Sequence, residues 1–355
     1  MSKFLSAAFG QRGIGLRRNL LGLFVPLIGA NLMVWIWALI VLHNNPVLLG
    51  TAFLAYTFGL RHAVDADHIA AIDNATRKLM QQGERPLAVG LFFSLGHSSI
   101  VILMSVLVGL TASNLGQSVP ELKQIGGVIS TIASASFLFF LAIFNIMLFR
   151  SVYRAFQQVK AGVNVAEAEM DLLLSGNGFL TRLFRRLFQL VSKSWHLFPI
   201  GFLFGLGFDT ATEVALFGIS AAQATNGLSF STILVFPALF TAAMSLVDTT
   251  DGILMIGAYG WAYERPIRKL FYNLTITAIS IIVALLVGGI ETLGLIGDKL
   301  GFEGSFWNMI AALDDNFGLL GYVIIGVFVL SWLVSMILYR LKGYALLDAR
   351  PTAAE

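Results

Sequence analysis

The sequence predicts an all-α polytopic membrane protein with about eight transmembrane helices. Hydrophobic residues make up 57% of its 355 residues and charged residues only 12%, whereas soluble domains carry about 25% charged residues. The apolar residues gather in stretches near the ~20 residues that a spanning helix needs. The charged residues fall mostly between these stretches. Composition and spacing together therefore indicate a membrane protein.

The predicted spans follow one another with short connections, apart from one long loop. The first is too long for the core of a signal peptide and lacks a small-residue cleavage pattern. The second and fifth are interrupted by acidic residues, the third by a histidine and the sixth by paired aspartates. The eight spans are residues 20–42, 50–75, 86–111, 126–149, 197–222, 230–258, 271–295 and 317–339. Together they form a single transport domain over residues 1–355, with a cytoplasmic loop at 150–196 between spans 4 and 5.

Basic residues divide between alternate connections. Twenty of the 23 lysines and arginines lie in the two terminal segments and in the loops after spans 2, 4 and 6. The other connections hold only Lys123 and Lys299, and Arg61 lies within span 2. By the positive-inside rule, both termini are cytoplasmic and the number of spans is even.

The composition also excludes several functions. The chain has no cysteine, so it forms no disulfide and holds no thiolate metal site. It contains no G-x-x-x-x-G-K-[ST] motif, and therefore no P-loop of its own. The basic residues are explained by membrane topology, so nucleic acid is not an expected partner, whereas membrane lipid is.

The two halves of the chain match weakly. Phe-Gly-Leu occurs in span 2 at 58–60 and in span 5 at 204–206, each time before acidic residues. Span 3 carries Ser-Leu-Gly-His at 94–97, and span 6 carries Ser-Leu-Val-Asp at 245–248. With alternating topology these spans run in opposite directions, which predicts an inverted repeat of spans 1–3 and 4–6. Transporters bind substrate at the interface of such repeats.

Residues 61–73 place six ionisable side chains within span 2. A charge at the bilayer centre costs roughly 2.5–3.5 kcal/mol on insertion scales, so a bound cation is the first explanation. His62, Asp65, His68 and Asp73 form one stripe on a straight helix, and Asp67 falls on another face. Asp65 is either a metal ligand or the partner of Arg61 four residues earlier, and the spacing leaves both open. Histidine with carboxylate suits a divalent first-row metal.

Three further spans offer partners for this cluster. His97 follows Gly96 in span 3, where glycine permits close helix approach. Asp209 and Glu213 share a face of span 5, and Asp248 and Asp251 share a face of span 6. The candidate metal-site residues outside span 2 are therefore His97, Asp209, Glu213 and Asp248. Interhelical hydrogen bonding between protonated acids is the alternative, strongest for Asp251.

These motifs resemble the four signatures of the nickel/cobalt transporter family. Residues 61–68 are similar to its His-x4-Asp-His motif, and residues 95–99, 206–213 and 246–252 to its other three. The resemblance is closest to bacterial permeases that supply nickel to hydrogenase or urease. It implies high-affinity uptake of Ni²⁺, sometimes also Co²⁺, through the bacterial inner membrane. Metal recognition in the family is attributed to the motif that maps here onto His62, Asp67 and His68.

The predicted function is thus secondary uptake of Ni²⁺ through an intramembrane His/Asp site, with no catalysis. The ion is a substrate and no cofactor is expected. Nothing in the sequence requires an ATPase subunit. A proton-coupled metal exporter and a membrane metalloenzyme are the alternatives. Because the family motif includes Asp67 and a straight helix excludes it, span 2 is expected to bend or unwind near residues 63–67.

Overall fold

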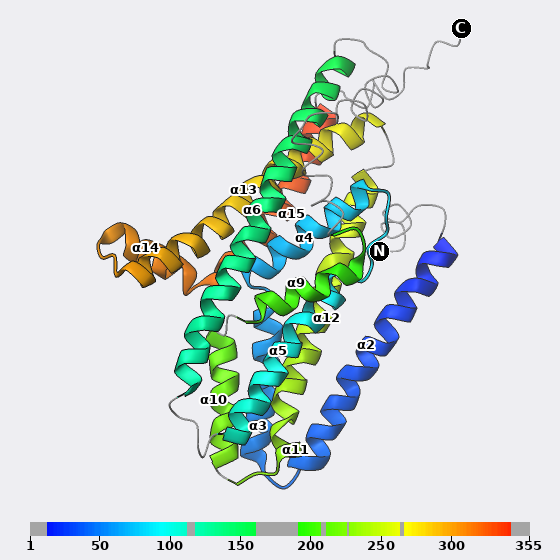
Figure 1. Ribbon diagram of the computed structural model, residues 1–355. Coiled ribbons are helices and arrows are strands. Elements are labelled where there is room, and N and C mark those ends of the chain that lie inside the picture. Colours follow the sequence, from blue (N-terminus) through cyan, green and yellow to red (C-terminus); the bar gives the residue numbers. More distant parts are fainter. Residues whose placement is uncertain are drawn as a thin grey trace.

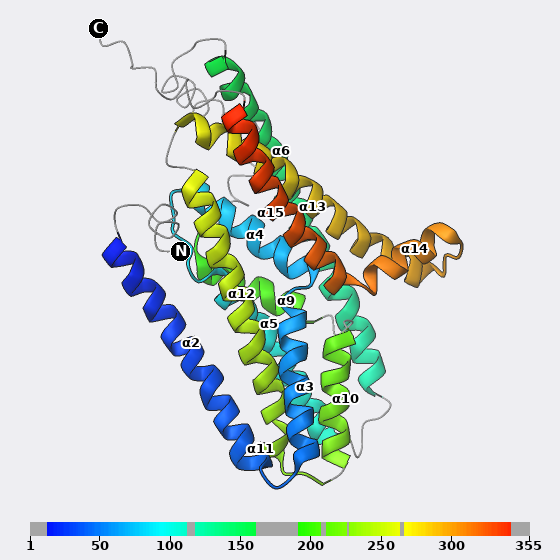
Figure 2. The same ribbon diagram turned by 180° about the vertical axis from the view of Figure 1, so that it is seen from behind.

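The computed structural model is helical throughout the part of the chain that it describes (Figures 1 and 2). It describes residues 13–111, 118–160, 191–206, 211–225, 227–262 and 266–341. The helices are α2 (Gly13–Leu42), α3 (Pro46–His62), α4 (Ala66–Gln81), α5 (Val89–Thr111), α6 (Ser118–Lys160), the short η2 (Ser194–His196), α9 (Leu197–Phe204), α10 (Ala211–Thr225), α11 (Phe230–Ile233), α12 (Val235–Ala262), α13 (Pro266–Leu300), α14 (Ser305–Asp314) and α15 (Phe317–Leu341).

Every predicted span coincides with a helix or a pair of helices. Within the described residues, five helices are long and apolar enough to cross a membrane, or up to seven if each of two bent pairs is one span. The predicted fifth span is divided between α9 and α10, and residues 207–210 between them lie outside the described residues. The polytopic helical fold is confirmed, whereas the number eight and the side of the termini remain predictions.

The second span is broken where the sequence predicted a break. α3 ends at His62, α4 begins at Ala66, and the two helices meet at 51°. Asp65 takes the extended conformation of a helix N-cap, with φ −65° and ψ 149°. The carbonyl of Val64 packs against Gly321 of α15, where a Cβ would overlap it. This close contact with Gly321 therefore holds the break between α3 and α4 against α15.

The directions of the helices match the inverted repeat. In Figures 1 and 2, α5 and α12 lie close together and run in opposite directions, as do the broken pairs α3–α4 and α9–α10. α5 packs on α9, and α12 packs on α3. The helix pairs that carry the four signature motifs thus cross near the middle of the molecule, which is where transporters with inverted repeats hold their substrate.

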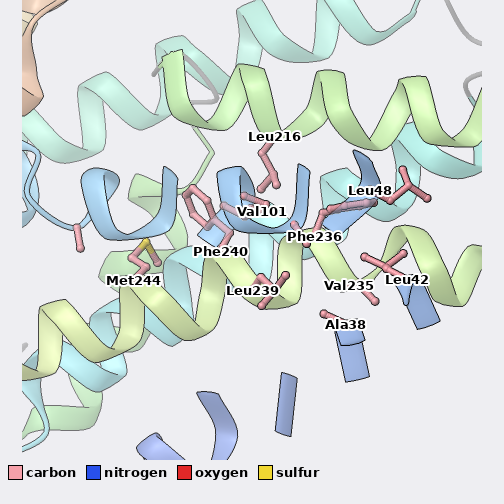
Figure 3. Close-up of a cluster of buried hydrophobic side chains, with 13 residues drawn as sticks. Ala38, Leu42, Leu48, Val101, Leu216, Val235, Phe236, Leu239, Phe240 and Met244 are labelled. Carbon is pink, nitrogen blue, oxygen red and sulfur yellow. The ribbon is translucent and has the colours of Figure 1, made fainter. Parts of the chain in front are cut away.

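An apolar cluster between α2, α3 and α12 supports one side of this crossing (Figure 3). Phe236 and Phe240 of α12 are completely buried there, against Ala52 and Ala55 of α3. The outer helices instead expose large apolar side chains. These include Leu32, Met33 and Ile40 on α2 and Leu330 and Ile337 on α15. An apolar exterior around a buried polar interior fits a bilayer as the surrounding solvent.

Two features of the fold were not predicted. α14 occupies a segment expected to be a simple connection, and it lies across the end of α13 (Figure 1). α6 continues to Lys160, so it includes the first eleven residues of the predicted 150–196 loop. Residues 161–190 of that loop lie outside the described residues.

Candidate metal centre

Three histidines, two from the helices on either side of the break and one from α5, form a compact buried group. His62 ends α3, His68 lies in the first turn of α4, and His97 lies in α5. Their ring centroids are 4.7–4.8 Å apart in all three pairs. Each residue offers a nitrogen within 4.8 Å of the others, and each residue is at most 2% exposed. The three imidazoles therefore face one another with almost no access to solvent around them.

His62 is held at both ring nitrogens. Its Nδ1 lies 2.9 Å from Oδ2 of Asp65 and 3.3 Å from the hydroxyl of Thr212. Its Nε2 lies 2.9 Å from Nε2 of His97. The sequence left Asp65 open between ligand and partner of Arg61. In the structure, the carboxylate of Asp65 contacts His62 and does not cap α4. A carboxylate that contacts the second ring nitrogen of a metal-binding histidine commonly orients the ring.

The other two histidines each meet a carboxylate from a different helix. Nε2 of His97 lies 3.0 Å from Oε1 of Glu213 in α10, and Nδ1 of His68 lies 3.3 Å from Oδ2 of Asp248 in α12. Nε2 of His68 and Nδ1 of His97 are buried and have no hydrogen-bond partner among the described residues. A buried nitrogen without a partner costs free energy, so a ligand at Nε2 of His68 would stabilise the site.

The remaining candidates have different positions. Asp67 lines a cavity beside His62 and His97, and its Oδ1 has no hydrogen-bond partner in the described part of the chain. The break therefore brings Asp67 near the centre, which a straight helix did not allow. Asp73 lies farther along α4 and accepts a hydrogen bond from Ser280. Asp209 lies outside the described residues.

The group has dimensions that suit a first-row metal ion. Two nitrogens that bind one ion at about 2.1 Å and at right angles are about 3.0 Å apart, and opposite nitrogens about 4.2 Å. The 2.9 Å between the Nε2 atoms of His62 and His97 matches the first arrangement. The largest separation within the triad, at most 4.8 Å, exceeds the distance between opposite nitrogens by about half an ångström. Small side-chain movements therefore suffice for all three to bind one ion.

Helix termini explain why the acids gather here. Asp65 and Asp67 lie at the N-terminus of α4, and Glu213 lies in the first turn of α10. The N-terminus of a helix carries a partial positive charge that stabilises a carboxylate. Each broken span thus begins its second half with an acid beside the histidines. The predicted close approach at Gly96 is also present, since a Cβ there would overlap the carbonyl of Phe198 in α9.

Comparison with known proteins decides the family. A family model described as high-affinity nickel-transport protein matches residues 48–338. The chain belongs to this family. It is 56% identical over 328 residues to the high-affinity nickel transport protein of Cupriavidus necator, covering 92% of this chain and 93% of that protein. No solved structure matches the chain.

Other relatives in the family differ in their printed roles. The hydrogenase nickel incorporation protein HupN of Bradyrhizobium diazoefficiens is 50% identical, covering 90% of this chain and 83% of that protein. The cobalt transport protein NhlF of Rhodococcus rhodochrous is 39% identical, covering 83% and 84%. The family identified from four short motifs is confirmed. Nickel and cobalt transporters share it, so membership alone does not distinguish the two metals.

Some cavity residues were missed by reasoning from the sequence. Thr212 lies in one of the four signatures, but the sequence assigned it no role. In the structure, its hydroxyl contacts Nδ1 of His62. Glu291 was not among the candidates from the sequence, yet it is 6% exposed and lines the same cavity as His62 and His97. No local motif marks Glu291. The available signal was a lone acid within an apolar span, which is costly without a function.

Proposed function

We propose that this protein takes up Ni²⁺, and Co²⁺ as a second substrate, across the bacterial cytoplasmic membrane. The observation that carries the proposal is the buried triad of His62, His68 and His97 at the break in a spanning segment. Broken helices at the middle of a membrane are the places where transporters hold ions. The chain's nickel- and cobalt-transporting relatives support the choice of ion.

The donor set suits these ions. We assign the three imidazoles as ligands, with Asp67 as a candidate oxygen ligand, and Asp65, Glu213 and Asp248 as the groups that orient the rings and balance charge. Asp209 is a further candidate from the family motif. Imidazole and carboxylate bind nickel well, but affinity alone does not favour Ni²⁺ over Cu²⁺, so selectivity depends on geometry. Planar or octahedral coordination would disfavour Zn²⁺, which prefers a tetrahedron.

The direction of transport is inferred from charge. If the basic connections are cytoplasmic, the cavity beside His62 and His97 opens to the outside. A divalent ion that moves inward across an inside-negative membrane gains about 4.6 kcal/mol per 100 mV, twice the value for a single charge. This gain supports accumulation without ATP, and hence without an ATPase subunit.

The test is uptake of ⁶³Ni²⁺ by cells that express the full chain. His62→Ala and His68→Ala are each expected to lower uptake about 100-fold or more at low Ni²⁺, since loss of an orienting partner alone costs 10–100-fold. The matched control is His43→Ala, because His43 is exposed and its ring contacts only the nearby Ile40 carbonyl in the described structure. Membrane levels of each variant are measured in parallel.

Three results would contradict the proposal. Full uptake by either variant at normal membrane levels would remove the triad from the substrate path. Loss of ⁶³Ni²⁺ from preloaded cells, without uptake, would indicate an exporter. Metal that the purified protein retains and never moves would indicate a metalloenzyme. Competition by Co²⁺, Zn²⁺ and Mn²⁺ in the same assay ranks the substrates.

A further inference from the structure

The first turn of α15 lies against the metal centre. α14 and α15 meet at 77°, and Asp315, Phe317 and Gly318 near this bend line the same cavity as His62 and His97. α15 also packs on α4, the second half of the broken span. None of these residues of the bend belongs to the four signature motifs. The bend therefore adds a wall to the centre that the motifs do not contain.

Gly318 approaches two side chains of the break at once. A Cβ at this position would lie 3.1 Å from Oδ1 of Asp65, 3.3 Å from Nε of Arg61 and 3.6 Å from its Nη2. Non-bonded heavy atoms pack best at about 3.5–4.0 Å, so the two shorter contacts leave no room for a side chain unless a neighbour moves. Residue 318 is helical, so glycine is needed here for close approach and not for an unusual backbone conformation.

The two oxygens of Asp65 have different surroundings. Oδ2 lies 2.9 Å from Nδ1 of His62, whereas Oδ1 faces the backbone of Gly318. The spacing of Arg61 and Asp65 would allow an ion pair. No hydrogen bond or ion pair joins them, although both side chains lie in the described part of the chain. The carboxylate therefore contacts the histidine and not the arginine, and its other oxygen meets α15.

The end of α15 that faces Asp65 carries a partial positive charge. Gly318 is the second residue of α15, and the first N–H groups of a helix have no acceptor within that helix. Their partial charge stabilises a nearby carboxylate. A side chain at position 318 would push Asp65 away from this positive end. The close approach of α15 thus stabilises the carboxylate in the place where it contacts His62.

We propose that Gly318 is a positioning residue of the metal centre and that it acts through Asp65. The backbone of α15 stands against Oδ1, so Oδ2 stays on Nδ1 of His62 and the other ring nitrogen faces the triad. This inference rests on the proposed function, in which His62 is a ligand. A carboxylate on the second ring nitrogen fixes the orientation of a ligand histidine and raises its basicity. The residue at 318 therefore sets the affinity of the centre without touching the ion.

The test is the initial rate of ⁶³Ni²⁺ uptake by the full chain in proteoliposomes, as a function of Ni²⁺ concentration. Gly318→Ala is expected to raise the half-saturating concentration about tenfold, the lower end of the cost of losing an orienting partner, and to leave the maximal rate within about twofold. The control is Gly326→Ala on the same helix, where a Cβ meets nothing within 4 Å. A lower melting temperature with an unchanged half-saturating concentration would show a purely structural role and overturn the proposal.

A double-mutant cycle shows whether Gly318 acts through Asp65. Asp65→Ala removes the oxygen that the new Cβ would meet, so in that background Gly318→Ala should change the half-saturating concentration by less than about twofold. A tenfold increase in both backgrounds would overturn the positioning role. If Gly318→Ala alone does not reach the membrane, the double variant decides. Restored membrane levels would support the contact with Asp65, and levels that stay low would contradict it.

Bound metal gives a second measurement that does not depend on transport. Co²⁺ bound to the purified full chain absorbs visible light, and its absorption bands depend on the geometry of its ligands. Gly318→Ala is expected to shift these bands, and Gly326→Ala to leave them unchanged. Identical spectra for wild type and both variants would overturn the positioning role.

The outcomes distinguish the two proposals. If Gly318→Ala takes up Ni²⁺ like Gly326→Ala while His62→Ala abolishes uptake, the positioning role is wrong and the proposed function stands. If the wild-type chain takes up no Ni²⁺, the proposed function itself fails, and the Co²⁺ spectra still decide whether Gly318 shapes the centre.

Discussion

The two ends of α4 have opposite electrostatic surroundings. At its start, Asp65 and Asp67 border the cavity that His62 and His97 also line. At its other end, Arg77 and Lys78 are each 1% exposed. Nε and Nη1 of Arg77 have no hydrogen-bond partner among the described residues, and Nζ of Lys78 lies 5.5 Å from the ring centroid of Phe140. We call these regions the open end and the sealed end.

The helix dipole accounts for only part of this difference. It favours acids at the N-terminus of α4 and bases at the C-terminus, typically by up to 1 kcal/mol. Burying a cation costs several kcal/mol, which is more than the stabilisation that the dipole provides. The open end thus gathers acidic side chains beside the histidines, whereas the sealed end buries two basic side chains.

The largest expected effect tests the groups that orient the histidines. Asp248→Asn and Glu213→Gln should each lower Ni²⁺ uptake at low concentration about 10–100-fold, the usual cost of losing such a partner. The amides keep the shape but lose the charge that faces His68 and His97. ⁶³Ni²⁺ uptake at matched membrane levels measures the change. Uptake equal to wild type would show that these acids only stabilise the fold.

The next prediction concerns the break between α3 and α4. Gly321→Ala should destabilise the protein by about 1–3 kcal/mol, as overpacking usually does, because the new Cβ overlaps the carbonyl of Val64. Gly326→Ala is the control on the same helix, where a Cβ meets nothing within 4 Å. Thermal unfolding in detergent measures both. Equal melting temperatures for the two variants would mean that the break is not held by this contact.

A smaller effect is expected at the sealed end. Arg77→Met removes two buried nitrogen donors that have no partner in the described part of the chain, which saves about 1–3 kcal/mol, and it loses one hydrogen bond to Asn74. Asn74 Oδ1 keeps its 2.6 Å hydrogen bond from Asn145. The variant should therefore be as stable as wild type or up to about 2 kcal/mol more stable.

The control for Arg77 is Asn145→Ala, which removes the amide that joins α6 to α4 and should cost about 1 kcal/mol. Half-saturation of Ni²⁺ uptake should stay unchanged in Arg77→Met, since the guanidinium lies away from the cavity lining. A marked loss of stability would show that the guanidinium has a stabilising role in this fold. A changed half-saturation would mean that the two ends of α4 are coupled.

The smallest effect is expected at the cavity rim. Asp298 lines the cavity, but its side chain is 74% exposed and lies 3.3 Å from Nζ of Lys299. At physiological salt, the field of an exposed charge is screened over a Debye length of about 8 Å. Asp298→Asn should therefore change the half-saturating Ni²⁺ concentration by less than about twofold. A tenfold shift would mean that exposed charge at the rim governs capture of the ion.

Much of the centre was predictable because its residues are costly in a membrane. His62, His68, His97, Glu213 and Asp248 stand out in apolar spans, and the structure brings these five together. The break near Asp67 was also predictable, from the conflict between a family motif and a straight helix. The pairing of each acid with its histidine was not, since it depends on contacts between residues up to 180 positions apart.

The sequence by itself determined the helical membrane class, the family and the positions where polar groups enter the bilayer. These follow from local composition and from short motifs, because each spanning helix satisfies its own backbone. The tertiary structure alone decided that Asp65 orients His62, that α14 lies over α13, and that Glu291 shares a cavity with the histidines. Such relations depend on how separate helices pack, and no spacing along the chain encodes that packing.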